Sequence, residues 1–229
     1  MKKHTIGFQP ASDQSILVHF GHEISLETHR EIVSFLKLLE AEPIQGIVNL
    51  HPAYCSVLVK FDPSKFTHAE IESSLAPHLA RLEKVKLPKP RLRQIPVCYG
   101  GHEGPDLDDV ASLHGLSVDE VIHLHSSATY TSYFLGFVPG FAYLGGLPAE
   151  LATPRLESPR KKVPAGSVAI GGNQTGVYPV ATPGGWRLIG RTPRKMLDPQ
   201  AKHMSFLEAG DQVRFVPISQ KEFREWDRE

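Results

Sequence analysis

Residues 163–194 read VPAGSVAIGGNQTGVYPVATPGGWRLIGRTPR, and this stretch indicates the fold of the second part of the chain. Its apolar runs are short, and glycines and prolines separate them. Many short strands joined by Gly/Pro turns are typical of a β-barrel or β-sandwich. The same texture begins near Ala128, so we expect strands at about 130–135, 167–170, 176–178, 186–189 and 212–218.

The first ninety residues have a different pattern. Residues 15–20, 44–50 and 56–61 have the composition of strands. Residues 26–39 carry apolar side chains at helical spacing, and a second helix is expected from Thr67, which forms a capping box with Glu70. The order β-α-β-β-α predicts a small α+β domain of split βαβ type.

A basic, proline-containing stretch from Lys86 to Arg93 separates the two patterns. Proline blocks helix continuation and favours extended chain, which suits a linker. After it we expect a strand at 94–99 and two short helices, the second capped by Ser117 with Glu120. The sequence therefore predicts an α+β domain at 1–87, a linker at 88–94 and a mainly-β barrel domain at 95–229.

The overall charge excludes some partner classes. Lys plus Arg equal Asp plus Glu at 25 each, so the chain offers no net field for nucleic acid or a membrane surface. The chain shows neither an apolar signal core nor a run long enough to cross a bilayer. The two cysteines, Cys55 and Cys98, lack metal or redox spacing, so we expect reduced thiols in a cytoplasmic protein.

One segment departs from this neutrality. Between Ser126 and Met196 there are eight basic residues against two acids, a net charge of about +6. Arginine holds carboxylate and phosphate groups in bidentate fashion. The segment therefore predicts a site for an anionic ligand, although arginines on barrel loops are more often simply solvated.

No complete catalytic constellation is visible. His123 and His125 would point to different faces of a helix, which argues against a shared metal ion. Gly171–Gly176 lacks the Lys-Ser/Thr ending of a phosphate loop, and neither cysteine has a catalytic setting. His125 could line a polar site or be a capping or core-edge residue. The missing constellation suggests that a partner completes the site.

Five motifs carry a resemblance to a known family. They are Gly136-Phe-Val-Pro-Gly-Phe, Val163-Pro-Ala-Gly-Ser-Val, Gln174-Thr-Gly-Val-Tyr-Pro, Thr182-Pro-Gly-Gly-Trp and Leu188-Ile-Gly-Arg-Thr-Pro. They resemble the allophanate hydrolase subunit 1 family, whose members include the 5-oxoprolinase B subunit, the histidine kinase inhibitor KipI and half of the carboxyltransferase region of urea carboxylase. The resemblance covers nearly the whole chain and is strongest from Ile95 to Pro193.

The resemblance implies a fold and partners. The expected fold is an α+β domain followed by a cyclophilin-like β-barrel. The expected partners are a homologous second subunit of the PxpC or KipA type and a third hydrolase subunit of the PxpA type. In such a complex ATP, with Mg²⁺, is the co-substrate that activates 5-oxoproline before hydrolysis to glutamate. No metal or prosthetic group is expected in this chain, and the isolated chain is expected to be inactive.

The candidate site residues follow from the basic segment and the resemblance together. We expect Arg155, Arg160 and Arg191 to contact the anion, Gln174 and Tyr178 to hydrogen-bond it, and His125 to line its pocket. Phe137, Pro139, Phe141 and Trp186 are expected to form a pocket wall or a partner contact. The catalytic residues themselves are not assigned.

Two other functions stay open. A KipI-like protein would bind a sensor histidine kinase and block its autophosphorylation. A carboxyltransferase-related subunit would act on urea or a similar amide and would need a biotin-carrying partner, and this chain has no Met-Lys-Met motif of its own.

Overall fold

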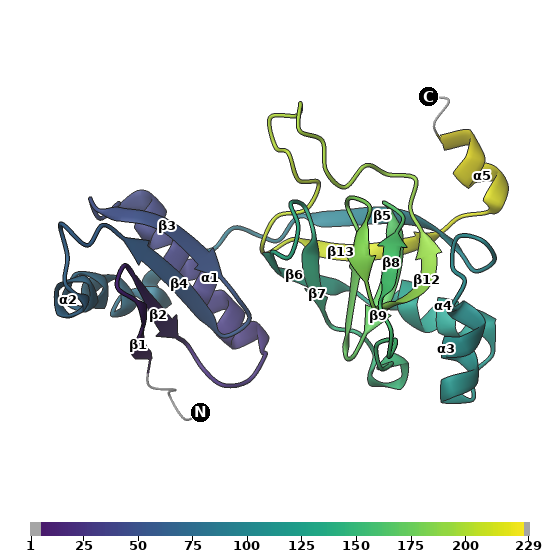
Figure 1. Cartoon of the computed structure of the whole chain (residues 1–229), viewed down its shortest axis with the longest axis horizontal. Coiled ribbons are helices and arrows are strands. Elements are labelled where there is room, and N and C mark those ends of the chain that lie inside the picture. Colours follow the sequence, from purple (N-terminus) through teal and green to yellow (C-terminus); the bar gives the residue numbers. More distant parts are fainter. Residues whose placement is uncertain (1–5, 227–229) are drawn as a thin grey trace. The chain divides into compact units, whose positions relative to one another are not determined.

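The computed structural model describes residues 6–226, and the chain divides into two compact units, Met1–Lys89 and Pro90–Glu229 (Figure 1). The first unit contains a four-stranded antiparallel sheet in the order β1-β2-β4-β3. Its elements are β1 (Gly7–Ser12), β2 (Ser15–His19), α1 (Leu26–Ala41), β3 (Ile47–Pro52), β4 (Ser56–Phe61), α2 (His68–Leu79) and the 3-10 turn η1 (Leu82–Lys84).

The topology of the first unit is a split βαβ arrangement. Strand β4 pairs antiparallel with both β2 and β3, so β2 and β3 run parallel with β4 between them and α1 as their connection. The helices pack on the sheet through buried side chains such as Ile32 and Phe35 of α1 and Ile71 of α2. The capping box of Thr67 and Glu70 is present at the start of α2. The predicted split βαβ order of these elements is therefore confirmed.

Strand β1 was not expected from the sequence. It pairs with β2 at the edge of the sheet, and most of its residues are exposed. Only Phe8 of this strand packs against the core, and its last four residues are exposed, so no alternation of apolar and polar residues reveals it.

The second unit contains a closed seven-stranded barrel in the order β10-β7-β6-β13-β5-β12-β9. Strand β13 runs parallel to β5, and the other pairs are antiparallel. The barrel strands are β5 (Leu92–Tyr99), β6 (Tyr130–Leu135), β7 (Ala142–Gly145), β9 (Ser167–Gly171), β10 (Gln174–Val177), β12 (Arg187–Arg191) and β13 (Gln212–Pro217). A barrel in this part of the chain is thus confirmed.

Shorter elements surround the barrel. They are α3 (Leu107–His114), α4 (Val118–Ser127), the 3-10 turn η2 (Ala149–Leu151), the two-stranded sheet of β8 (Arg160–Val163) and β11 (Thr182–Gly184), and α5 (Gln220–Glu225) (Figure 1). The capping box of Ser117 and Glu120 starts α4 as expected. Inside the barrel lies one apolar core, to which Ile95, Val168 and Phe215 contribute, and α3 and α4 add Val110 and Val121 to it.

The start of the barrel differs from the expected linker. Strand β5 begins at Leu92 and pairs with β13 from there, so residues 92–94 belong to the barrel sheet. The strand start was missed because basic residues and proline are typical of a linker, whereas here Arg91 and Arg93 pair with Asp211 at the barrel end.

Among residues 6–226, no helix combines the length and the apolar character that crossing a membrane requires.

Candidate functional site

A second apolar core lies on the outer face of the barrel wall. Along β9, Val168 and Ile170 face the barrel interior, whereas Ala169 faces outward, as alternation along a strand requires. The side chains packed over it form what we call the aromatic cluster: Phe141, Tyr143, Tyr178 and Trp186, with Val138, Val163 and Leu188 beside them. Phe141 lies at its centre, with ring centroids 5.1 Å from Tyr143, 5.5 Å from Tyr178 and 5.6 Å from Trp186.

Glycines make room for these rings. A Cβ at Gly171 would lie 2.6 Å from the Trp186 ring, and a Cβ at Gly184 would collide with the Tyr178 hydroxyl. Neither glycine has a positive φ, so close approach and not a left-handed backbone explains the residue type here. Glycines in this Gly/Pro-rich stretch thus also make room for aromatic side chains.

Arg155 lies against the aromatic cluster. Its guanidinium carbon is 5.7 Å from the centroid of the Trp186 ring, a cation–π contact. Burial raises the pKa of Tyr178, and the nearby charges of Arg155 and Arg160 pull it the other way without overcoming the burial. Tyr178 therefore stays a neutral hydroxyl. Within residues 6–226, Arg155 forms no ion pair with a carboxylate, so its charge is available.

Arg160 belongs to the same region but is already paired. Its Nη2 donates to Oδ1 of Asp106 at 2.6 Å, and Asp106 is only 4% exposed. The other oxygen of Asp106 accepts from the backbone N–H of Leu188 at 2.6 Å. This carboxylate joins β8 to β12 and to the start of α3, which gives Arg160 a structural role. Its Nη1 is buried and has no acceptor.

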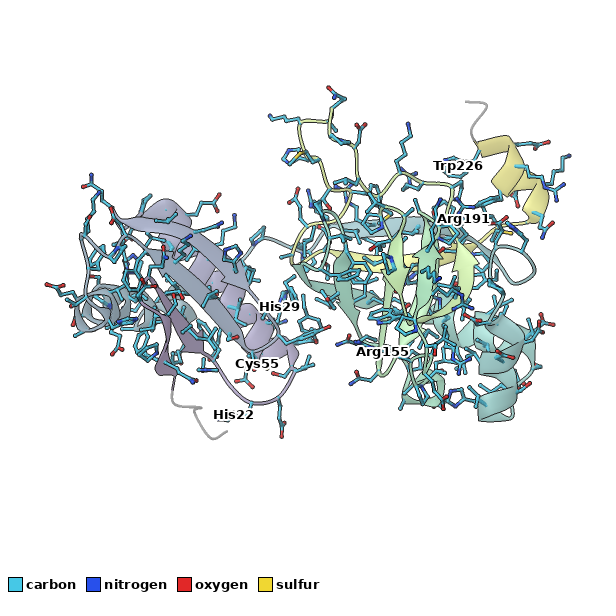
Figure 2. All side chains as sticks on the ribbon, in the orientation of Figure 1. His22, His29, Cys55, Arg155, Arg191 and Trp226 are labelled. Atoms are coloured by element: carbon cyan, nitrogen blue, oxygen red, sulfur yellow. The ribbon has the colours of Figure 1, made fainter. Side chains whose placement is uncertain are left out.

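Arg191 lies away from Arg155, as Figure 2 shows. Its Nε donates to the carbonyl of Ala165 at 2.8 Å, and its Nη1 is 3.4 Å from Glu103. Arg187 is similarly 3.5 Å from Asp109. Three of the eight basic residues in the Ser126–Met196 segment thus have carboxylate partners in residues 103–109, just before that segment. Counting charges within the segment alone overstated its local excess of positive charge.

The loop between β6 and β7 presents an exposed aromatic side chain. Phe137 is 61% exposed and has a φ of 68°, whereas every other residue with a positive φ among residues 6–226 is a glycine. The backbone N–H of Val138 donates to the carbonyl of Gly136 at 2.8 Å, so Phe137 is the central residue of a γ-turn, a strained conformation. Pro139 is also exposed, and Leu135–Gly140 line a shallow hollow. The Phe137 ring is 5.7 Å from that of Phe141, which connects this loop to the aromatic cluster.

His125 lies inside the barrel and does not line an open pocket. It is completely buried, stacks on Phe215 with ring centroids 4.5 Å apart, and burial lowers its pKa from 6.5 to about 3. The hydroxyl of Thr175 donates to the carbonyl of Ala169 at 3.0 Å, so this hydroxyl must accept from Nε2 of His125 at 2.9 Å. Nδ1 then accepts from the hydroxyl of Tyr99 at 2.7 Å. His125 is a neutral core histidine with both ring nitrogens satisfied.

Gln174 stands at the start of β10, where its backbone pairs with that of Gly171 beneath the Trp186 ring, and its side chain is half-buried. Metal binding by the chain itself finds no support in residues 6–226, where no group of three or more His, Cys, Asp and Glu side chains comes together. Burial raises the pKa of both thiols, Cys55 and Cys98, which disfavours the reactive thiolate.

The structure therefore brings six of the ten sequence-predicted residues together: Phe137, Phe141, Arg155, Arg160, Tyr178 and Trp186, with Pro139 beside Phe137. Gln174 lies near them through the backbone, while Arg191 and His125 lie elsewhere. The carboxylates of Glu103, Asp106 and Asp109 were missed, and Gly104-Pro-Asp-Leu is the sequence signal that could have found Asp106. A free guanidinium beside aromatic faces can bind an oxyanion or a protein surface, but it supplies no nucleophile.

Comparisons with known proteins show which family the chain belongs to. A family model described as carboxyltransferase domain, subdomain C and D, matches residues 6–207. The 5-oxoprolinase B subunit of Bacillus subtilis (strain 168) is 40% identical over 231 residues, which cover 95% of each chain. The solved structure of PH0987 from Pyrococcus horikoshii is 50% identical, with a TM-score of 0.57, over 94% of this chain and 99% of that one.

A further solved structure, TTHA0988, belongs to a longer chain. It is 35% identical with a TM-score of 0.79, and the match covers 90% of this chain but 40% of that chain. The match of the family model over residues 6–207, together with 40% identity to a full-length relative, shows that this chain belongs to the family of carboxyltransferase domains of subdomain C and D, the family that contains the 5-oxoprolinase B subunit.

Proposed function

We propose that this chain is the B subunit of an ATP-dependent 5-oxoprolinase, which cleaves 5-oxo-L-proline to L-glutamate, and that it acts only with partner subunits. The observation that carries the proposal is the 40% identity to a protein of that name over 95% of both chains. The site geometry supports it, because a free guanidinium on an aromatic platform suits an anionic ligand and the cluster lacks a nucleophile of its own.

Arg155 is the residue that we propose to contact the substrate anion. 5-Oxoproline carries a carboxylate, and a guanidinium without a competing carboxylate can bind it through two parallel hydrogen bonds. The neutral hydroxyl of Tyr178 and the amide of Gln174 would supply further hydrogen bonds. Arg160 and Arg191 are weaker candidates, because each would have to leave or share its carboxylate partner. His125 would act only indirectly, by holding Thr175 of β10 next to Gln174.

ATP, with Mg²⁺, is proposed as the co-substrate of the whole complex. A magnesium ion in such a site is bound mainly by the nucleotide phosphates and water, so it requires no dedicated protein cage in this chain. That expectation is compatible with the lack of a metal-ligand group among residues 6–226. We also keep a cytoplasmic location as part of the proposal.

The loop around Phe137 is proposed as a partner contact. A strained turn that holds an aromatic ring in solvent is favoured where the ring serves recognition, and buried aromatic anchors carry much of the energy of protein interfaces. The homologous second subunit is the proposed occupant. We choose this occupant because the match to TTHA0988 covers only 40% of that longer chain. In TTHA0988 a further segment is therefore covalently joined to this fold. A third, hydrolase subunit would complete the reaction.

The proposal is tested by co-expressing this chain with candidate second and third subunits and measuring ATP hydrolysis that depends on 5-oxoproline. We expect the second subunit to co-purify with this chain and the substrate-dependent ATPase to require both. A stable complex whose ATP hydrolysis ignores 5-oxoproline would contradict the proposed substrate.

Inhibition of a sensor histidine kinase is the second candidate function. The exposed Phe137 is the observation that favours it, because the same ring could bind a kinase surface. Excess wild-type chain should then suppress kinase autophosphorylation and the Phe137→Ala variant should not. Unchanged autophosphorylation with excess wild-type chain would exclude this candidate for the kinase tested.

A further inference from the structure

Two further arginines lie on one aromatic ring at an end of the barrel. The guanidinium carbon of Arg93 is 5.1 Å from the centroid of Phe206, and that of Arg194 is 4.8 Å from the same centroid. The two cationic groups are therefore within about 10 Å of each other, a separation at which salt does not fully screen their repulsion. Arg194 also lies over the ring of Trp226, at 5.6 Å.

This end of the barrel is the end at which β5 begins. Arg93 is the second residue of β5 and lies on the strand face that buries Ile95 and Val97 in the core, since side chains alternate along a strand. The segment after β12 crosses the same end, with Met196 buried in the barrel core and bonded through its carbonyl to the N–H of Phe206. Mouths of barrels are common positions for ligand sites.

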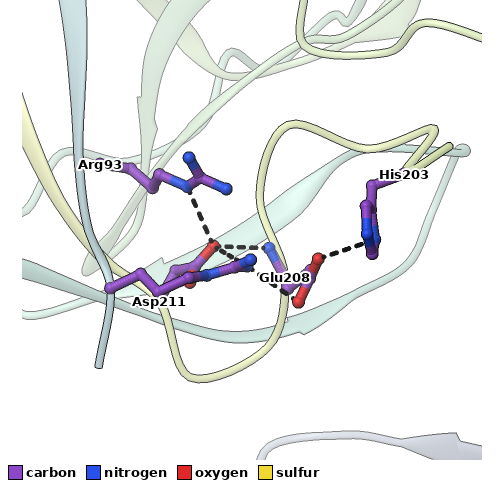
Figure 3. Close-up of polar contacts among 5 residues, drawn as sticks. Arg93, His203, Glu208 and Asp211 are labelled. Atoms are coloured by element: carbon purple, nitrogen blue, oxygen red, sulfur yellow. Dashed lines mark hydrogen bonds and ion pairs between the residues drawn. The ribbon is translucent and has the colours of Figure 1, made fainter. Parts of the chain in front are cut away.

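The carboxylates near these arginines are already engaged. Asp211 receives two hydrogen bonds from Arg91, at 2.8 Å and 3.0 Å, and one from the N–H of Glu208, and it is 3.8 Å from Nε of Arg93 (Figure 3). Glu208 pairs with Arg91 at 2.8 Å and with His203 at 3.3 Å. Arg91 and Arg93 thus use these two carboxylates, and Arg194 adds a positive charge that neither carboxylate neutralises.

The positive charge that is not neutralised belongs to Arg194. In the part of the chain that the structure describes, Arg194 forms no ion pair, and the Nε atoms of both Arg93 and Arg194 are buried without an acceptor. Buried donors without partners cost free energy and call for an explanation, such as a bound ion. Stacking fixes the planes of the guanidinium groups, so less side-chain entropy is lost when an anion binds their edges.

We propose that Arg93 and Arg194, oriented by Phe206 and Trp226, form an oxyanion site that recognises a phosphate group. The site is separate from Arg155 and does not depend on the proposed 5-oxoprolinase function. A phosphate group fits because it offers several acceptor oxygens and two negative charges to two guanidinium groups. The group can belong to free phosphate or to the phosphates of a nucleotide.

The test uses the full chain and inorganic phosphate as the probe. Phosphate is titrated against sodium chloride at matched ionic strength, and binding is followed by the fluorescence of Trp226 and by the melting temperature. We expect a saturable fluorescence change and a raised melting temperature with phosphate alone. A wild-type response that is the same for phosphate and chloride would overturn the proposal.

Variants identify the residue that binds. Arg194→Met is expected to weaken phosphate binding at least about tenfold, while Arg194→Lys, which keeps a point charge, should lose less. Lys195→Met removes the same charge from the neighbouring exposed residue and should bind as wild type does. Arg155→Met should also bind normally. Phosphate binding that survives in Arg194→Met, or that is lost in Arg155→Met instead, would overturn the assignment, and circular dichroism of each variant checks its fold.

A parallel titration with ATP in the absence of divalent cations separates the two sources of the phosphate group. Binding of ATP at least about tenfold tighter than phosphate, lost in Arg194→Met, would identify nucleotide phosphates as the ligand. Equal affinities would identify free phosphate. Both results require Arg194 and therefore support the site.

Discussion

Arg155 differs from Arg160, Arg187 and Arg191 in having no carboxylate partner among residues 6–226, and it lies against the ring of Trp186. We predict that Arg155→Met lowers kcat/KM of the reconstituted complex for 5-oxoproline by about 10- to 100-fold, because a hydrogen bond to a charged group contributes about 1.5–3 kcal/mol. Steady-state kinetics at saturating ATP measure this effect. The exposed Lys162, mutated to Met, removes the same charge nearby and should change kcat/KM less than twofold. Equal losses in both variants would mean that only general charge matters.

His125 connects β5, α4 and β10 inside the barrel. We predict that His125→Phe lowers the free energy of unfolding by about 1–3 kcal/mol at pH 8, because the Tyr99 hydroxyl is left buried without an acceptor. Urea denaturation measures the change. His123→Gln, at an exposed position on the same helix, should stay within about 0.5 kcal/mol of wild type. A His125→Phe variant as stable as wild type would contradict the network.

The same residue gives a pH dependence. Burial lowers the pKa of His125 from 6.5 to about 3, so below pH 6.5 the unfolded chain binds a proton that the folded chain does not. The free energy of unfolding should therefore fall as the pH decreases from 6.5 towards 3. His29, whose pKa burial lowers to about 4, adds to the same trend. Between pH 7 and pH 5 the slope should be smaller in His125→Phe than in wild type.

At the residue scale the sequence indicated several of the residues that lie at the candidate site, but it did not show which of them are paired or buried. It selected Arg155, Tyr178 and Trp186, which the structure brings together. It could not show that Arg160 is neutralised by Asp106, because the two residues are 54 positions apart and only the fold joins them. For the same reason the burial of His125 was one of two open alternatives until its partners Tyr99 and Thr175 were located.

The β6–β7 loop combines backbone strain with an exposed ring. We predict that Phe137→Gly leaves the free energy of unfolding within about 1 kcal/mol of wild type, since relief of the positive φ offsets the greater freedom of the unfolded glycine. The same variant should bind the second subunit at least about tenfold more weakly, because the aromatic anchor is gone. Calorimetry measures both quantities.

Leu113→Ala provides the control for this loop, because Leu113 is a comparably exposed apolar side chain on α3. It should not change the affinity for the second subunit. If Phe137→Gly binds that subunit as tightly as wild type does, the loop is not the contact surface.

At the element scale, helices and longer strands were predictable because they carry periodic apolar patterns and capping boxes, as α2 and α4 do. The short strands β7, β8 and β11 were missed. Strand β8 contains Arg160, Lys161 and Lys162, and β11 contains a proline, so their composition does not indicate a sheet. Strand β7 forms as part of the barrel between β6 and β10, and β8 and β11 form by pairing with each other, so the causes are tertiary.

The two cores of the second unit lie entirely within Pro90–Glu229. We propose that this unit is an independent domain of cyclophilin-like type and that Met1–Lys89 is a second domain. A fragment of residues 90–229 should then unfold cooperatively, and its near-ultraviolet circular dichroism should show fixed aromatic side chains. A fragment that binds hydrophobic dyes and lacks a cooperative transition would contradict the domain boundary.

At the scale of the whole molecule, we propose that this chain is a necessary subunit of a 5-oxoprolinase. The most direct measurement is glutamate release from 5-oxoproline by the purified complex, with ATP and with each subunit omitted in turn. The account predicts release that needs ATP and stops when this chain alone is left out. Release that continues at the same rate without this chain would contradict the account.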